Sequence, residues 1–258
     1  MMPDILVMST ENELGEEAAR RFVEAAQAAV AARGAFSVAL AGGSSPAALY
    51  QALATPARSD LVPWRQVHVF FGDERCVPPS HPESNYGAAW RILHPLPVPP
   101  MQVHRMLGEM DPNAAARRYE EGLRAFFGAG VPRFDLILLG LGDDGHVASL
   151  FPGSPALNER ERLAVATTSP RGVPRRLTLT LPVLNAARQV IFLVPQADKA
   201  GVVRRVLQSR PGERRLPAHA VEPAGALTWL LTRAAARQLT QPETAAAPAG
   251  PAGASRVE

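Results

Sequence analysis

Short apolar runs alternate with amphipathic segments along most of the chain. Continuous apolar runs are typical of buried strands, and they occupy residues 36–41 (FSVALA), 67–72, 134–140 and 189–195, with an alternating pattern over 175–187. Apolar residues at helical spacing predict helices over 13–33, 113–127, 199–208 and 225–239. Strands that alternate with helices predict an α/β fold, a mainly parallel sheet flanked by helices on both faces.

Local signals mark where several helices begin or end. Gly34 follows the first helix and is expected to close it. Serine before proline in a first turn predicts a helix beginning at Ser45-Pro46. Further helices are expected to begin near Asn85 and, as a short one, at His146.

The alternation of strands and helices also sets the expected domain limits. We expect residues 1–239 to form a single α/β domain, since a chain of 258 residues is long enough for one large domain. Residues 240–258 (TQPETAAAPAGPAGASRVE) are rich in Ala, Pro and Gly, a composition typical of a disordered tail.

Composition and charge argue against several classes of protein. The net charge of +3 comes with arginines scattered along the chain, so we expect no nucleic-acid partner. No apolar run approaches the roughly 20 residues that span a bilayer, and no signal peptide is evident, so we expect no membrane association. A single cysteine, Cys76, excludes a disulfide framework and is interpreted as structural. A cytoplasmic location follows as the expectation.

Polar segments follow four of the predicted strands. They are Gly42-Gly43-Ser44-Ser45, Asp73-Glu74-Arg75, Asp143-Asp144-Gly145-His146 and Asp198-Lys199. Ligands bind outside the carboxyl ends of the strands in an open parallel sheet. The four segments are therefore expected to share one ligand site.

The first of these segments predicts an anion site. Gly42 and Gly43 let the backbone approach a ligand, and a helix starting after them offers free N–H groups and a positive dipole end. The alternative is an ordinary capped turn. Lys199 is the only lysine among 27 basic residues, and its flexible ammonium suits a phosphate.

The stretch LLGLGDDGHVASLFPG (138–153) fits the pattern G-x-G-x-x-G. We reject a dinucleotide loop, because no acid lies about 20 residues further on, around residue 165, and because Asp143 and Asp144 would repel a pyrophosphate. His146 is instead interpreted as a general base, with a helix N-terminus expected to lower its pKa. The six histidines show no clear metal-site spacing, and no G-x-S-x-G elbow is present.

Two further candidate site residues, Arg75 and Asn85, each have two possible roles. Arg75 can bind an anion or stabilise an oxyanion, or form a salt bridge with Asp73 or Glu74. Asn85, with the serine before it, can cap a helix or bind sugar hydroxyls.

With these residues identified, the chain resembles the glucosamine-6-phosphate isomerase/6-phosphogluconolactonase family. The matching segments are ALAGGSSP, FFGDERCVPPSHPESNYG, LLGLGDDGHVASLFPGS, RRLTLTLPVLNAAR, FLVPQADKA and LPAHAVEP followed by GALTWLL. The resemblance, strongest to the lactonase branch, implies a modified Rossmann-like fold. It also implies hydrolysis of 6-phospho-D-glucono-1,5-lactone to 6-phosphogluconate in the oxidative pentose phosphate pathway, with no metal or organic cofactor.

The resemblance also implies roles for individual residues. Phosphate would be held by Gly42, Gly43, Ser44, Ser45 and Lys199, with Asn85 also in the binding set and with Arg176 favoured over Arg171 and Arg175 as a further contact. His146 would be the base with Asp144 beside it, and Arg75 would sit near the lactone with Asp73 as neighbour.

Two rival functions remain at this point. A glucosamine-6-phosphate deaminase shares the D-G-H segment but continues into N-E-P, whereas no acid follows His146 before Glu159. A non-catalytic sugar-phosphate-binding regulator would usually carry an added DNA-binding domain, for which this chain has no spare length. We expect a small phosphorylated sugar lactone as the partner and a monomer or small homo-oligomer.

Overall fold

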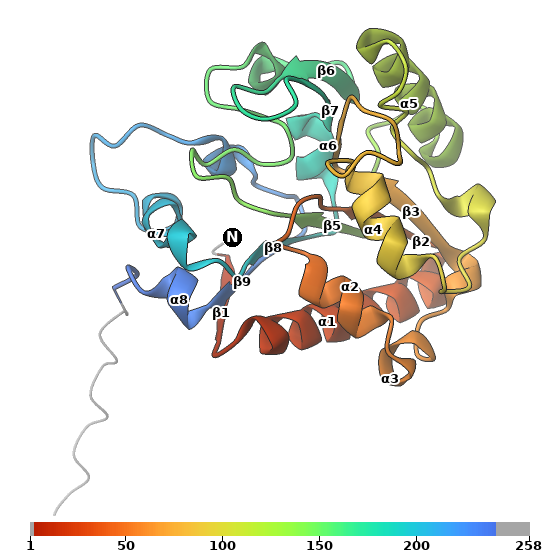
Figure 1. The fold of residues 1–258 in the computed structure, drawn as a ribbon, viewed down its shortest axis with the longest axis horizontal. Helices are drawn as coiled ribbons and strands as arrows, with labels where there is room; N and C mark the ends of the chain where they lie inside the picture. Colours follow the sequence, from red (N-terminus) through yellow and green to blue (C-terminus); the bar gives the residue numbers. More distant parts are fainter. Residues whose placement is uncertain (1–2, 241–258) are drawn as a thin grey trace, which may run out of the picture.

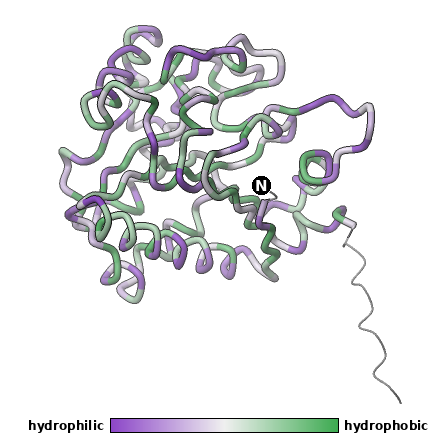
Figure 2. Tube along the Cα trace, turned by 180° about the vertical axis from the view of Figure 1, so that it is seen from behind, coloured by the Kyte–Doolittle hydropathy of each residue, from purple (hydrophilic) through white to green (hydrophobic). Residues whose placement is uncertain are grey.

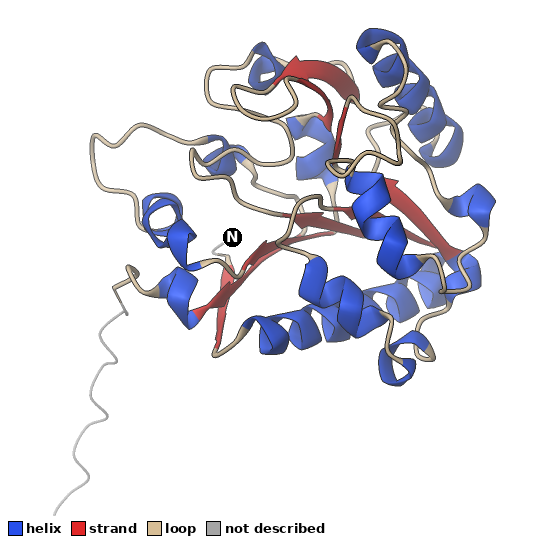
Figure 3. Cartoon of the chain, in the orientation of Figure 1, coloured by secondary structure: helices blue, strands red, loops and turns tan. Residues whose placement is uncertain are grey.

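A six-stranded parallel sheet crosses the middle of the molecule in this computed structural model, which describes residues 3–240 (Figures 1 and 3). Its strands are, in spatial order, β1 (Asp4–Met8), β9 (Ala226–Thr232), β8 (Gln189–Val194), β5 (Leu136–Leu139), β2 (Phe36–Leu40) and β3 (Val67–Phe71). Every neighbouring pair is parallel. The predicted α/β architecture is therefore confirmed.

One face of the sheet is covered by the N-terminal helices α1 (Glu11–Arg33), α2 (Ala47–Leu53) and α4 (Asn85–Leu93). The short α3 (Pro56–Ser59) lies against α1 and α2. Val38 and Leu136, paired across β2 and β5, point into the hydrophobic core on this side. Their neighbours Ala39 and Ile137 point into the core on the other side. This alternation follows from the pleat of a strand buried on both faces, and Figure 2 shows the hydrophobic strands at the centre.

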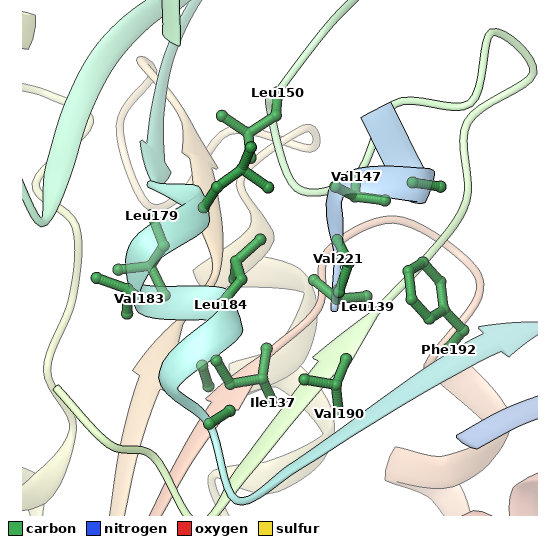
Figure 4. Close-up of a cluster of buried hydrophobic side chains, with 14 of the residues drawn as sticks. Ile137, Leu139, Val147, Leu150, Leu179, Val183, Leu184, Val190, Phe192 and Val221 are labelled. Carbon is green, nitrogen blue, oxygen red and sulfur yellow. The ribbon is translucent and has the colours of Figure 1, made fainter. Parts of the chain in front are cut away.

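The opposite face carries helices and a second, smaller sheet. The helices are α5 (Pro112–Phe127), α6 (Leu181–Ala186), α7 (Ala200–Leu207) and α8 (Arg233–Ala236). The second sheet is antiparallel and has the order β4 (Asp73–Arg75), β7 (Arg175–Leu179), β6 (Ala164–Thr168). Figure 4 shows how Ile137, Leu139 and Val190 of the main sheet pack near Val183 and Leu184 of α6.

Short 3₁₀ helices complete the fold at Trp64–Gln66, Pro100–Gln102, Pro155–Asn158, Ala197–Lys199 and Pro217–Ala220. Gly34 closes α1 as predicted, with a φ of 76° that favours glycine. Within residues 3–240, none of the helices combines the length and the apolar content that crossing a membrane requires. The tail predicted to be disordered lies, beyond residue 240, outside the described residues.

The prediction of a helix over 225–239 is wrong. Residues 226–232 form β9, which pairs in parallel with β1 on one side and β8 on the other, and only four residues of helix follow. A short apolar run cannot be assigned to helix or strand by periodicity alone. The Ala-rich end of the segment favoured helix, but the buried Trp229, Leu230 and Leu231 lie between two partner strands.

The prediction of a helix start at His146 is also wrong, whereas the helix predicted after Ser45-Pro46 is confirmed as α2, although Ser45 does not cap it. Gly145 has a φ of 79° and Ala148 a φ of 48°, which exclude a right-handed helix. These residues form two tight turns, closed by hydrogen bonds from Gly145 N–H to Gly142 and from Leu150 N–H to Val147. In the first loop, α2 begins at Ala47 after Pro46, with no side-chain cap.

Candidate active site

The four polar segments predicted to meet do lie around one cleft, with a volume of about 510 Å³. The strand order places it. After β2 the chain adds β3 on one side of β2 and then β5, β8 and β9 on the other, so the order reverses between β2 and β5. Ligand sites of open α/β sheets lie at such a reversal, outside the carboxyl ends of the strands. The polar segment 73–75 forms strand β4 of the small sheet, and Asp73 and Arg75 of this strand line the cleft.

His146 is held by Asp144 in the loop after β5. Asp144 Oδ1 accepts hydrogen bonds from the His146 backbone N–H at 3.0 Å and from ring Nδ1 at 2.6 Å. Burial raises the pKa of Asp144, but these hydrogen bonds outweigh it and hold that pKa below its ordinary value. An ionised carboxylate only accepts, so Nδ1 carries a hydrogen and Nε2 is the ring nitrogen that can take up a proton.

Two neighbours restrict the His146 ring further. The Phe151 ring lies against it, with centroids 4.6 Å apart. Gly142 lies on another side, so close that a Cβ there would be 2.0 Å from Nδ1. Glycine at 142 is therefore required for the ring to take this position.

Asp73 is buried under the cleft and both of its carboxylate oxygens are occupied. Oδ1 accepts from the Asn85 side-chain amide at 2.9 Å, and Oδ2 accepts from Ser149 Oγ at 2.6 Å. Asn85 Oδ1 has no hydrogen-bond partner among the described residues. Ser84, not Asn85, caps α4, because its Oγ accepts from Gly87 N–H at 3.0 Å. Asp73 thus fixes one side chain at the start of α4 and one in the loop after β5.

Two arginines stand side by side at the cleft. Arg75 of β4 and Arg176 of β7 are direct cross-strand partners, and both line the cavity. Within the described residues both guanidiniums donate to backbone carbonyls, Arg75 to Glu83 at 2.6 Å and Arg176 to Val173 at 2.8 Å, and neither forms an ion pair. Burial and the charge of Arg75 lower the pKa of Arg176. Like charges placed opposite each other are unfavourable, so this pair is suited to an anionic ligand.

The alternative salt bridge from Arg75 to Glu74 is absent from the described residues. Glu74 is 2% exposed and accepts from backbone N–H groups, at 2.7 Å from both Arg75 and Asn85 and at 2.8 Å from Tyr86. Burial raises its pKa. Glu74 therefore ties β4 to the start of α4 and leaves the Arg75 guanidinium directed elsewhere.

Lys199 forms an ion pair with Asp143 across the cleft. Arg171 Nη1 lies 3.8 Å from the other oxygen of the same carboxylate. Lys199, Arg171 and Arg176 all line the cleft, whereas exposed Arg175 does not. An aspartate thus stands between two cations that face the cavity.

Ser44 and Ser45 are joined to Gln196, a residue that the sequence reasoning missed. Gln196 Nε2 donates to Ser44 Oγ at 3.2 Å, and its Oε1 accepts from Ser45 Oγ at 3.3 Å. Ala47 N–H donates to the Ser44 carbonyl, so the turn itself uses one donor expected to face an anion. The sequence gives no local signal for Ser149, whereas Gln196 follows a strand end three residues before Lys199.

No metal site is evident in the described chain. Residues 3–240 contain no group of three or more His, Cys, Asp or Glu side chains placed to hold an ion. Burial and the nearby Glu74 raise the pKa of Cys76 to about 11, so its thiol is protonated at neutral pH.

Comparisons with known proteins agree with this arrangement. Residues 9–229 match the family model described as glucosamine-6-phosphate isomerases/6-phosphogluconolactonase. The 6-phosphogluconolactonase of Homo sapiens is 43% identical over 92% of this chain and 94% of its own, and that of Synechocystis is 40% identical over 93% and 99%. The structure of 6-phosphogluconolactonase from Trypanosoma cruzi superposes with a TM-score of 0.83 at 31% identity, over 93% of this chain and 98% of that one. The chain therefore belongs to the glucosamine-6-phosphate isomerase/6-phosphogluconolactonase family.

Proposed function

We propose that this protein is a 6-phosphogluconolactonase, a hydrolase that opens 6-phospho-D-glucono-1,5-lactone to 6-phosphogluconate in the oxidative pentose phosphate pathway. Relatives at 40–43% identity that carry this name over nearly the whole chain support the assignment. The structural observation that carries it is a histidine oriented by an ionised aspartate in a cleft that also holds four cations, Arg75, Arg171, Arg176 and Lys199. A cytoplasmic location and a monomeric or small oligomeric state remain predictions.

His146 acts as the general base in the proposed mechanism. Nε2 takes a proton from a water molecule, and the resulting hydroxide attacks C1 of the lactone. The imidazolium formed is stabilised by Asp144 at 2.6 Å. It then gives the proton to the ring oxygen as the C1–O bond breaks, which leaves a free carboxylic acid and the alcohol. Assistance of this kind contributes about 10²–10⁴-fold to the rate.

Arg75 stabilises the tetrahedral intermediate. Its guanidinium reaches the cleft without an ion-pair partner among the described residues, so its charge is available to the developing oxyanion. Asp73 serves as a positioning residue, since both of its oxygens are used by Asn85 and Ser149.

The substrate phosphate is held by the remaining cations and the glycine-serine loop. Lys199 and the loop 42–45 line the cleft together with Arg171 and Arg176. Arg171, Arg175 and Arg176 were the three candidates for a phosphate contact. Arg176 is the most buried, at 7% exposure, and its Nε is held by a hydrogen bond to the Val173 carbonyl. Arg175 is the least suited, because it does not line the cleft.

Proton release from freshly made 6-phosphogluconolactone in weak buffer tests the assignment, after correction for spontaneous opening. We expect a clear excess over background, absent with unphosphorylated gluconolactone. His146→Ala should remove at least about 99% of the excess, since acid–base assistance is worth at least about 10²-fold. Wild-type protein that gives no excess would refute the function, and an active His146→Ala variant would refute the role of the histidine.

The deaminase alternative has less support in this cleft. Glu159, the first acid after His146, is half-buried and does not line the cavity. Release of ammonia from glucosamine 6-phosphate would favour that function instead.

A further inference from the structure

Gln196 joins two loops that come from distant parts of the chain. It follows β8, and its side chain contacts Ser44 and Ser45 after β2, about 150 residues earlier. Its carbonyl also accepts the N–H of Lys199 at 3.2 Å. The same short turn therefore holds the ammonium and the two hydroxyls that face the proposed phosphate position.

The two hydrogen bonds of Gln196 make the adjacent serines chemically different. A hydroxyl has one hydrogen to donate and two lone pairs to accept with. Ser45 gives its hydrogen to Gln196 Oε1, and Ser44 accepts a hydrogen from Gln196 Nε2. Ser44 thus keeps its own hydrogen, whereas that of Ser45 is already used. Ser44 is also the more exposed of the two.

We propose that Gln196 is a positioning residue that directs the Ser44 hydroxyl hydrogen toward the substrate phosphate. This inference rests on the proposed function. Ser44 then donates to the phosphate, while Ser45 serves to anchor the Gln196 amide. Gln196 itself does not need to touch the substrate, so its loss weakens binding through Ser44.

A double-mutant cycle between Gln196 and Ser44 tests this inference. The variants are Ser44→Ala, Ser45→Ala, Gln196→Ala and the double variant of Ser44 and Gln196. KM and kcat for the lactone and Kd for 6-phosphogluconate are measured for each. Gln27→Ala is the matched control, since it removes an amide that donates to the Leu61 carbonyl in another part of the molecule.

Ser44→Ala should raise KM and Kd by about tenfold, the effect of losing a hydrogen bond to a charged group. Ser45→Ala should raise them clearly less, and kcat should stay within about twofold for both, because the catalytic groups are untouched. The double variant should be no worse than Ser44→Ala, since residues that act through one contact are not additive. Gln196→Glu should raise KM further than Gln196→Ala, because a carboxylate accepts from both serines and repels phosphate.

The inference is overturned if Gln196→Ala and Ser44→Ala are additive, or if Ser45→Ala is as harmful as Ser44→Ala. It is also overturned if Gln196→Ala lowers kcat rather than raising KM. Failure of the proposed function looks different, because the wild-type protein would then release no protons from the lactone.

Discussion

Replacement of Gly142 by alanine should disable His146 without touching it chemically. The new Cβ would lie 2.0 Å from Nδ1 and 2.1 Å from Cε1 of the ring, whereas ordinary contacts begin near 3.4 Å. The ring must therefore retreat by about 1.4 Å, the difference between 3.4 and 2.0 Å. Nδ1 is also the atom that donates to Asp144 at 2.6 Å, so this retreat breaks the bond that orients the base.

The expected loss follows from that displacement. A misplacement of about 1 Å in a reacting group costs about 10²-fold in rate. We therefore expect Gly142→Ala to lower kcat about 100-fold or more. KM should change little, because the three atoms nearest to the new Cβ all belong to His146 and none to a residue proposed to bind phosphate. Initial rates of proton release from the lactone measure both quantities.

Gly140→Ala is the matched control from the same loop. Its Cβ would lie 3.5 Å from Ser45 Oγ, an ordinary contact, and neither glycine has a positive φ. We expect kcat within about threefold of wild type, because the added methyl group makes only an ordinary contact and does not reach the His146 ring. If Gly142→Ala kept more than a tenth of the wild-type kcat, the reasoning about the ring position would be refuted.

Three further results are expected. Asp143→Asn removes the ion pair with Lys199, so the ammonium becomes fully available to the substrate phosphate. KM should fall by up to about fivefold, because an exposed ion pair is worth up to about 1 kcal/mol. A higher KM would contradict this expectation. Burial and His68 lower the pKa of His104 to about 4 from 6.5, so stability falls as the pH drops through that range. His104→Phe should reduce this loss of unfolding free energy at low pH by at most about 3 kcal/mol. Urea unfolding at a series of pH values measures it. Trp229→Ala, which breaks a core ring stack at 3.9 Å, should cost about 3–5 kcal/mol in urea unfolding, whereas Ile5→Ala on exposed β1 should cost under about 0.5 kcal/mol.

The polar segments after strands were the most predictable part of the site. Apolar runs such as 36–41 and 134–140 identify strands, and the parallel arrangement brings their carboxyl ends to one edge whatever the details of the loops. The loops themselves were less predictable. Gly145 and Ala148 adopt positive φ, so a segment that reads as a helix start at His146 turns back twice instead.

Contacts between distant segments could not be predicted from local pattern. Arg75 and Arg176 become partners because β4 pairs with β7, and nothing in the sequence of either strand specifies this pairing. Gln196 gains its role from serines about 150 residues away. β9 likewise depends on two partner strands, since its own residues suit a helix equally well.

The pairing of β1 with β9 has a consequence for synthesis of the chain. Asp4 pairs with Thr228, so the two paired residues lie 224 positions apart in the sequence, the difference between 228 and 4. A ribosome adds about 5–20 residues per second, so β1 waits at least about ten seconds for its partner. During that time Ile5 and Val7, which stay partly exposed even in the finished sheet, are on an unpaired strand. A nascent strand of this kind is open to wrong pairing and is a natural target for a chaperone.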